Sequence, residues 1–86
     1  MAYKILWDKR AYRDLKNLDV QNAVTILNAL NKLYEHPEQA GKQLKGKLKN
    51  GFRLRIGNYR VLYTINPKEQ IVAIFAVGHR KDIYDV

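Results

Sequence analysis

Hydrophobic and polar residues alternate with two different periods along this chain. Residues 3–7 (YKILW) are an apolar, aromatic run that stops at Asp8, which predicts a short strand. From about Lys9 to Leu18, apolar residues recur every three or four positions with charged residues between them, which predicts a short helix. The chain is therefore expected to begin with a strand that leads into a helix.

A second, longer helix is predicted from Val20 to about Tyr34. Asp19 suits its N-cap, because a carboxylate there accepts hydrogen bonds from free backbone N–H groups. Pro37 forces the residue before it out of helical geometry and so ends the helix. The apolar stripe of this helix contains Val20, Ala23, Val24, Leu27, Leu30 and Tyr34, and is widened by Ile26, Ala29 and Leu33. We expect the stripe to face the core, with docking to a partner helix as the alternative.

Period-two alternation takes over after a loop region that spans residues 37–51. Residues 52–65 alternate on both sides of Gly57 and Asn58, a pair that suits a two-residue hairpin turn, so two strands are predicted there. Residues 71–77 (IVAIFAV) are apolar at every position, as in a central strand covered on both faces. These three strands follow one another closely enough to form a meander.

The predicted elements assemble into a single α+β domain over residues 1–86. It contains an N-terminal strand, an αα-hairpin and three further strands, the first two of which form a hairpin. A chain of 86 residues has the length of one domain. Its apolar fraction of 47% is enough for a hydrophobic core, which argues against global disorder.

The hairpin turn decides which side chains share a face of the sheet. With the two-residue turn at its tip, Ile56 lies opposite Tyr59 and Arg55 lies opposite Arg60. The apolar face then carries Phe52, Leu54, Ile56, Tyr59, Val61, Tyr63 and Ile65. The other face carries Arg53, Arg55, Arg60, Leu62 and Thr64. We expect the apolar face to pack on the helices and the arginine-bearing face to stay open.

Arg55 and Arg60 form a like-charged cross-strand pair, which destabilises a sheet by up to about 1 kcal/mol. No acidic residue on these strands relieves the repulsion. One explanation is that the long side chains diverge into solvent and cover apolar surface with their stems. Bidentate recognition of phosphate by the guanidinium groups is the explanation that we favour.

An excess of positive charge surrounds this hairpin. The chain has a formal net charge of +8 and a pI near 9.9, and no Asp or Glu occurs between Glu38 and Glu69. The expected partner is a polyanion: first a nucleic acid, then an acidic protein, then an anionic membrane. Four lysines of the loop region are candidate RNA phosphate contacts: Lys42, Lys45, Lys47 and Lys49. The alternative is a basic domain whose charge only keeps it soluble.

The composition excludes several kinds of site. The chain has no cysteine, which rules out disulfides, thiolate metal sites and cysteine nucleophiles. Its two histidines, His36 and His79, lack metal-ligand spacing, and we expect no metal or cofactor. No apolar run resembles a signal peptide or a transmembrane segment, so a cytoplasmic protein without a membrane partner is expected.

The residues after the last predicted strand extend the basic chemistry. If residues 71–77 form the central strand, His79, Arg80 and Lys81 leave the sheet at one end, close to the hairpin. His79 can exchange protons near neutral pH, and Tyr84 can stack on a base. Packing of Tyr84 on its own sheet is the alternative.

The order of the elements and two sequence phrases resemble a known family. The chain contains LKGKLKNGFRLRIGNYRVLYTI and VGHRKDIY, and it resembles the RelE/ParE superfamily of bacterial toxin–antitoxin toxins over nearly its whole length. The resemblance implies a compact α+β domain in which the N-terminal helices pack on an antiparallel sheet of about four strands. It also implies silencing by a cognate antitoxin that wraps the toxin.

Two activities occur in this superfamily. RelE-like members are endoribonucleases that enter the ribosomal A site and cut mRNA without a metal ion, leaving a 2′,3′-cyclic phosphate and a 5′-hydroxyl. ParE-like members share the fold but inhibit DNA gyrase and lack that catalytic set. The resemblance implies an mRNA interferase whose partners are the ribosome with its rRNA, the mRNA and an antitoxin. Gyrase inhibition and a generic RNA-binding module are the alternatives.

The resemblance also assigns residues. Arg53 and Arg55 match basic strand positions of the ribonuclease members, and Arg60 matches the arginine that follows the first aromatic of the next strand. Arg80 and Tyr84 match an arginine after the final strand and a C-terminal tyrosine. In that scheme the arginines stabilise the extra negative charge on the pentacoordinate phosphate.

The general base has two candidates. The resemblance assigns this role to Tyr84, and His79 is the alternative because an imidazole side chain can exchange protons near neutral pH. Arginine stays protonated, so the basic strand residues cannot take a proton from the 2′-hydroxyl.

Overall fold

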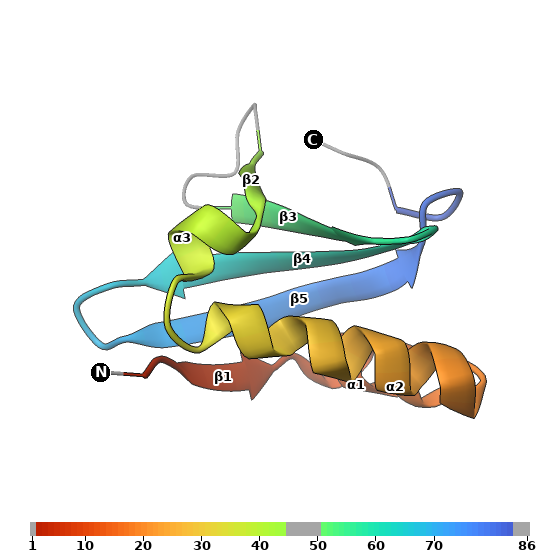
Figure 1. The fold of residues 1–86 in the computed structure, drawn as a ribbon. Coiled ribbons are helices and arrows are strands. Elements are labelled where there is room, and N and C mark those ends of the chain that lie inside the picture. Colours follow the sequence, from red (N-terminus) through yellow and green to blue (C-terminus); the bar gives the residue numbers. More distant parts are fainter. Residues whose placement is uncertain (1, 45–50, 84–86) are drawn as a thin grey trace.

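Five strands form one sheet in the order β1-β5-β4-β3-β2 (Figure 1). The structure is a computed structural model that describes residues 2–44 and 51–83. The strands are β1 (Lys4–Trp7), β2 (Lys42–Gln43), β3 (Gly51–Ile56), β4 (Tyr59–Asn66) and β5 (Ile71–His79). The central position of β4 in this order explains why its inward side chains are the most deeply buried of the hairpin.

The helices are α1 (Lys9–Lys16), α2 (Val20–Ala29), the 3-10 helix η1 (Leu30–Leu33) and α3 (Pro37–Ala40). Asp8 caps α1, because its carboxylate accepts a hydrogen bond from the backbone N–H of Arg10 at 3.1 Å. Asp19 occupies the N-cap of α2 without a side-chain capping bond, and its carboxylate accepts from the Asn22 side chain instead. The predicted capping bond of Asp19 is therefore wrong, although the helix begins where we expected.

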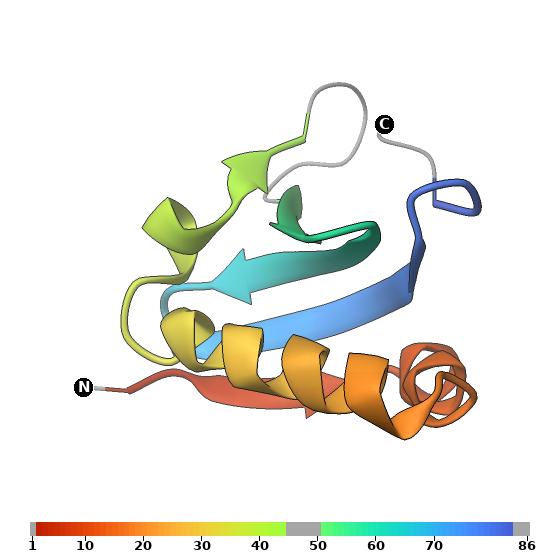
Figure 2. The ribbon, with the colours of Figure 1, turned by 45° about the vertical axis from the view of Figure 1, so that its right-hand side comes forward.

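One face of the sheet is covered by α1, α2 and η1 (Figure 2). The predicted buried stripe of the second helix is wrong in its centre. The side chains that enter the core are Ile26, Leu30 and Leu33, whereas Val20 is 79% exposed. Val24, Leu27 and Tyr34 are also exposed. Because the apolar side of this helix is wider than its contact with the sheet, part of it stays outside, and partner-helix docking there remains a prediction.

The α+β fold with an N-terminal strand, consecutive helices and an antiparallel meander is confirmed. The sheet nevertheless has five strands rather than about four, because β2 and α3 form within the predicted loop region. The implied fully antiparallel sheet is wrong, since β1 pairs with β5 in parallel. The helices carry the chain away from β1, and the meander brings it back beside β1 in the same direction.

The uniformly apolar β5 is an inner strand, between β1 and β4, as predicted. The predicted cover on both faces is wrong, because the helices cover only one face of β5 (Figure 2). A register shift places Leu62 opposite Ala76 but Tyr63 opposite Ile74, so Phe75 is an extra residue in the ladder. This irregularity shifts the two-residue alternation of β5 by one position at Phe75. Within the described ranges, no helix has the length and apolar character needed to span a membrane.

Candidate functional site

The β3–β4 hairpin has the register predicted from its turn. Arg55 pairs with Arg60, and Ile56 pairs with Tyr59. Gly57 has a φ of 60° at the first turn position, where a type II′ turn needs glycine. The apolar face packs into the core as predicted, with Leu54, Val61, Tyr63 and Ile65 buried and Phe52, Ile56 and Tyr59 packed against them. The arginines are therefore on the face that the helices leave uncovered.

Arg60 is the buried charged residue of this face. Its side chain is 8% exposed, whereas that of Arg55 is exposed. The Nη1 of Arg60 donates to the carbonyl oxygens of Tyr59, at 3.2 Å, and Gly57, at 3.4 Å. These bonds hold the Arg60 guanidinium beside the turn. The fold therefore positions the charge of Arg60, whereas the side chain of Arg55 extends into solvent.

Cross-strand pairing extends the positive charge to the edge of the sheet. Lys42 of β2 lies opposite Arg53 of β3, and directly opposed residues share a face. Lys42 was predicted to lie in a loop, and it is a strand residue instead. We call Lys42, Arg53, Arg55 and Arg60 the basic face. Beside it, β5 presents small residues on the same face, namely Ala73, Ala76 and Gly78. A row of cationic side chains therefore lies beside a strand whose side chains on this face are small, an arrangement that suits an extended polyanion.

The segment after β5 turns toward the hairpin tip. The backbone N–H of Arg80 donates to the carbonyl of Asn58 at 2.7 Å, and the Arg80 side chain is exposed. This bond places Arg80 next to the turn that also anchors Arg60. The two arginines that the resemblance assigned to the phosphate are therefore brought to the same end of the sheet.

His79 lies apart from the basic face. It pairs with Tyr59, and the two rings meet edge to face with centroids 5.5 Å apart. Tyr59 belongs to the helix-covered face and its hydroxyl accepts from the side chain of Asn22. The Nδ1 of His79 accepts the backbone N–H of Lys81 at 3.2 Å, so a neutral ring in this position carries its proton on Nε2. The structure does not bring the imidazole together with the arginines.

The remaining predicted site residues lie outside the described ranges. They are Lys45, Lys47, Lys49 and Tyr84. In residues 2–44 and 51–83, no group of three or more His, Asp or Glu side chains is arranged to hold a metal ion.

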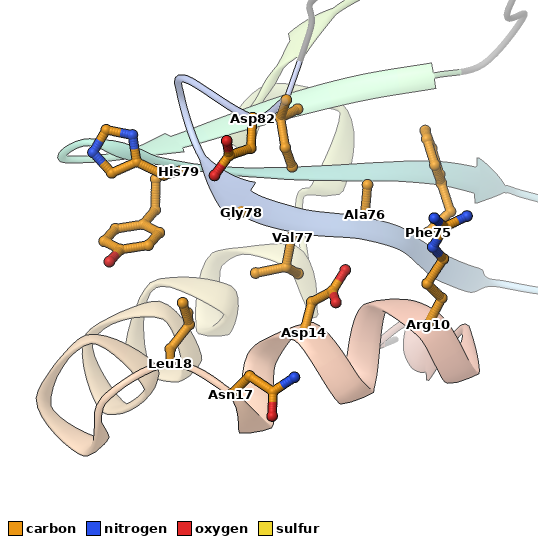
Figure 3. Close-up of a pocket in the computed structure, with 12 residues that line it drawn as sticks. Arg10, Asp14, Asn17, Leu18, Phe75, Ala76, Val77, Gly78, His79 and Asp82 are labelled. Carbon is orange, nitrogen blue, oxygen red and sulfur yellow. The ribbon is translucent and has the colours of Figure 1, made fainter.

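A cleft of about 600 Å³ opens at the outer edge of β5, where β1 has ended (Figure 3). Figure 3 shows Asp14 of α1 and Asp82 of the terminal turn on two sides of the cleft, with Val77 between them. Arg10 and His79 also line it. The mixed charge makes this cleft a poor site for a polyanion. No pattern in the sequence indicated it, because its walls come from segments near the two opposite ends of the chain.

Comparisons with known proteins agree with the resemblance. A family model described as the ParE toxin of the type II toxin–antitoxin system parDE matches residues 5–84. The chain is 35% identical over 85 residues to Toxin RelG of Mycobacterium tuberculosis, covering 98% of each chain. It superposes with a TM-score of 0.85 and 31% identity on a chain of the toxin–antitoxin complex RelBE2 from the same organism, covering 93% of this chain and 100% of that one.

The isolated RelE toxin of Escherichia coli is also similar in structure. Its TM-score is 0.79 at 21% identity, over 91% of this chain and 84% of that one. At 21% identity this structural similarity shows a shared fold.

Proposed function

Because this chain belongs to the RelE/ParE superfamily of toxins of type II toxin–antitoxin systems, we propose that it is a RelE-like endoribonuclease that cuts mRNA in the ribosomal A site and so inhibits translation. The observation that carries the proposal is the Arg55–Arg60 pair on the open face of the sheet. Two opposed guanidinium groups repel each other, which costs stability. Recognition of a phosphate by both groups would offset that cost.

The proposed reaction is an internal transesterification. The 2′-oxygen forms a bond to the adjacent phosphorus, the bond from phosphorus to the 5′-oxygen breaks, and the products are a 2′,3′-cyclic phosphate and a 5′-hydroxyl. The 2′-hydroxyl loses a proton to a base and the departing 5′-oxygen gains one. Arg60, held by the turn, and Arg80, beside it, would stabilise the charge on the pentacoordinate phosphate. Arg53 and Arg55 would hold the flanking strand.

The general base is not one of the arginines of the basic face, since a guanidinium group does not give up its proton in proteins. Tyr84 and His79 remain the two candidates. The hydrogen bond from Lys81 to Nδ1 of His79 leaves only a protonated Nε2 to face outward, which favours Tyr84. The pH–rate profiles of Tyr84→Phe and His79→Gln would distinguish them, because removal of the base abolishes the rising limb of the profile.

The test is cleavage of mRNA on ribosomes programmed with a defined A-site codon. The Arg60→Ala, Arg80→Ala double variant should lower the rate by roughly 10²–10³-fold or more, as the loss of charge-stabilising donors does elsewhere. Because Arg80 is exposed and Arg60 is buried, the single Arg80→Ala variant should fold like wild type and still lower the rate. Cleavage at the wild-type rate by a folded double variant would refute the site, and intact mRNA with wild-type protein would refute the activity.

A second candidate is a ParE-like poison of DNA gyrase. It is favoured by the match of residues 5–84 to the ParE family model. The basic face would then be a surface that docks on a protein. Loss of supercoiling by purified gyrase, with mRNA left intact in growth-arrested cells, would establish this function instead of cleavage.

We also propose a cognate antitoxin as partner. A chain similar to this one was solved within the toxin–antitoxin complex RelBE2 of Mycobacterium tuberculosis, and another within a RelE–RelB complex from Pyrococcus horikoshii. A segment that covers the basic face has to be acidic or amphipathic to compensate its charge. Its association rate with this toxin should therefore fall steeply as salt rises, and a rate independent of salt would contradict electrostatic steering.

A further inference from the structure

A second cleft lies at the opposite edge of the sheet from the one in Figure 3. Among the described residues, β2 pairs with β3 through Lys42–Arg53 and Gln43–Phe52, and the Leu44 N–H donates to the Gly51 carbonyl. None of these contacts reaches beyond Arg53 toward the hairpin tip, so β2 leaves that part of the outer edge of β3 uncovered. There β3 faces α3 and the start of β2 (Figure 1). The space between them is an open cleft of about 380 Å³. We call it the β3-edge cleft; its walls are Lys32, Ala40, Gly41, Lys42, Arg53, Leu54 and Arg55.

The charge of this cleft has one sign. Four of its seven lining residues are cationic, none is acidic, and they come from three separate elements, η1, β2 and β3. The carboxylate of Glu35 lines a neighbouring cleft, and Lys32 of η1 lines both clefts. Lys32, Lys42 and Arg55 are exposed. A concave site with cations on several sides binds an anion more strongly than the same charges spread over a flat surface.

Tyr63 fixes the far wall of the cleft. Its buried hydroxyl donates to the carbonyl oxygen of Pro37 at 2.7 Å and accepts the backbone N–H of Gly41. Both ends of α3 are thereby tied to the centre of the sheet. Gly41 permits the close approach, because a Cβ at this position would lie 2.6 Å from the carbonyl oxygen of Arg53 and would meet the Tyr63 hydroxyl. The backbone between α3 and Lys42 is therefore fixed before a ligand arrives, which lowers the cost of binding.

The cleft and the basic face are continuous. Lys42, Arg53 and Arg55 belong to both, and only Lys32 is added from the helical layer. β2 and β4 are separated by two strand spacings, about 10 Å. A nucleic acid strand whose scissile phosphate lies at Arg60 can therefore place a neighbouring phosphate in the cleft. A small anion would occupy either the position at Arg60 or the β3-edge cleft, whereas a nucleic acid strand can occupy both.

We propose that the β3-edge cleft binds a backbone phosphate of RNA next to the phosphate that is cut, so that Lys32 and Lys42 position the strand. This inference rests on the proposed function. The phosphate comes either from the mRNA or from ribosomal RNA in the A site, and the chemistry that recognises it is the same. Lys32 is a positioning residue, because it reaches the RNA but not the reacting phosphate.

The test compares Lys32→Gln/Lys42→Gln with Lys4→Gln/Lys68→Gln, which removes the same charge from exposed positions on β1 and in the β4–β5 turn. The probe is a fluorescent single-stranded RNA with a 2′-deoxy group at the cut position, so binding is measured without cleavage. The cleft variant should bind roughly tenfold more weakly. The slope of log affinity against log salt should become shallower by about 0.7, because the variant neutralises one phosphate fewer, and the control variant should keep the wild-type slope.

Binding to ribosomes with an open A site identifies the source of the phosphate. A weaker affinity for the short RNA assigns it to mRNA, and a weaker affinity for ribosomes alone assigns it to ribosomal RNA. Equal slopes of log affinity against log salt for the cleft and control variants in both assays would overturn the proposal. A cleft variant that loses affinity for an acidic peptide but for neither RNA nor ribosomes would also overturn it. Wild-type protein that binds RNA with its full salt slope but cuts nothing would refute the nuclease while leaving the cleft intact.

Discussion

Arg55 of β3 lies directly opposite Arg60 of β4, and only Arg60 is withdrawn into the protein. The turn carbonyls accept its guanidinium N–H groups, while Arg55 is exposed. Solvent around Arg55 therefore screens the repulsion between the two charges from one side. This arrangement sacrifices some stability at the place where phosphate binding is proposed.

Replacing Arg55 by threonine should separate stability from function. The Arg55→Thr variant loses a like-charged pair and gains a residue with high strand propensity, so its free energy of unfolding should rise by about 0.5–1 kcal/mol. Its cleavage of mRNA should fall in the same preparation. Urea denaturation gives the first quantity. The control is Lys4→Thr, which lies opposite the apolar Ile71 and should gain less; an Arg55→Thr variant less stable than wild type would contradict the argument.

Removal of the Tyr63 hydroxyl should destabilise the fold. Tyr63→Phe leaves the Pro37 carbonyl and the Gly41 N–H without their buried partner, which costs about 1–3 kcal/mol. The exposed Tyr12 gives a matched control, since Tyr12→Phe should change stability by less than about 0.5 kcal/mol. Equal free energies of unfolding for the two variants would show that α3 is held by other contacts.

Alkaline pH should weaken the same contact. Burial raises the pKa of Tyr63 from 10.0 to about 12, and the N–H bond from Gly41 lowers it only in part. Because the folded-state pKa lies above the unfolded one, this contribution is complete below pH 10. It is lost between pH 10 and 12, at up to about 1.4 kcal/mol per pH unit. The difference in stability between wild type and Tyr63→Phe should narrow in that window, and a constant difference would argue against the raised pKa.

The inward side of α2 and η1 can be checked with two leucines. Leu30→Ala should cost about 2–4 kcal/mol, because Leu30 is 4% exposed and its removal leaves a cavity. Leu27→Ala should cost less than about 1 kcal/mol, since Leu27 is 46% exposed. Thermal or urea unfolding measures both. Similar costs would mean that the predicted stripe faces the core after all.

The structure of the C-terminal hairpin could be predicted from the sequence in more detail than that of the N-terminal helices. The hairpin register followed from a two-residue turn, because strand side chains alternate strictly and one turn orients them all. The second helix was harder. Its apolar residues surround more than half of its circumference, so the pattern located the helix without deciding whether Val24 or Ile26 faces the sheet.

The candidate site divides in the same way. The charge of Arg55 and Arg60, and their opposition, followed from local alternation. The separation of His79 from the two arginines did not follow from local alternation. It depends on which face of β5 carries His79, and the register shift at Phe75 decides that face. Lys32 was not recognised at all, since its distance from the arginines in sequence conceals their shared cleft.

The sequence by itself determined the order of the longer elements, the two-faced hairpin and the family, since each depends on contacts within a few residues or on a continuous motif. Tertiary structure alone decided that β1 joins β5 in parallel, that Lys42 extends the sheet, and that Tyr63 ties down α3. The physical reason is the range of the interactions. Turn geometry and alternation are local, whereas strand order, buried hydrogen bonds and clefts depend on segments that meet only when the whole core is packed.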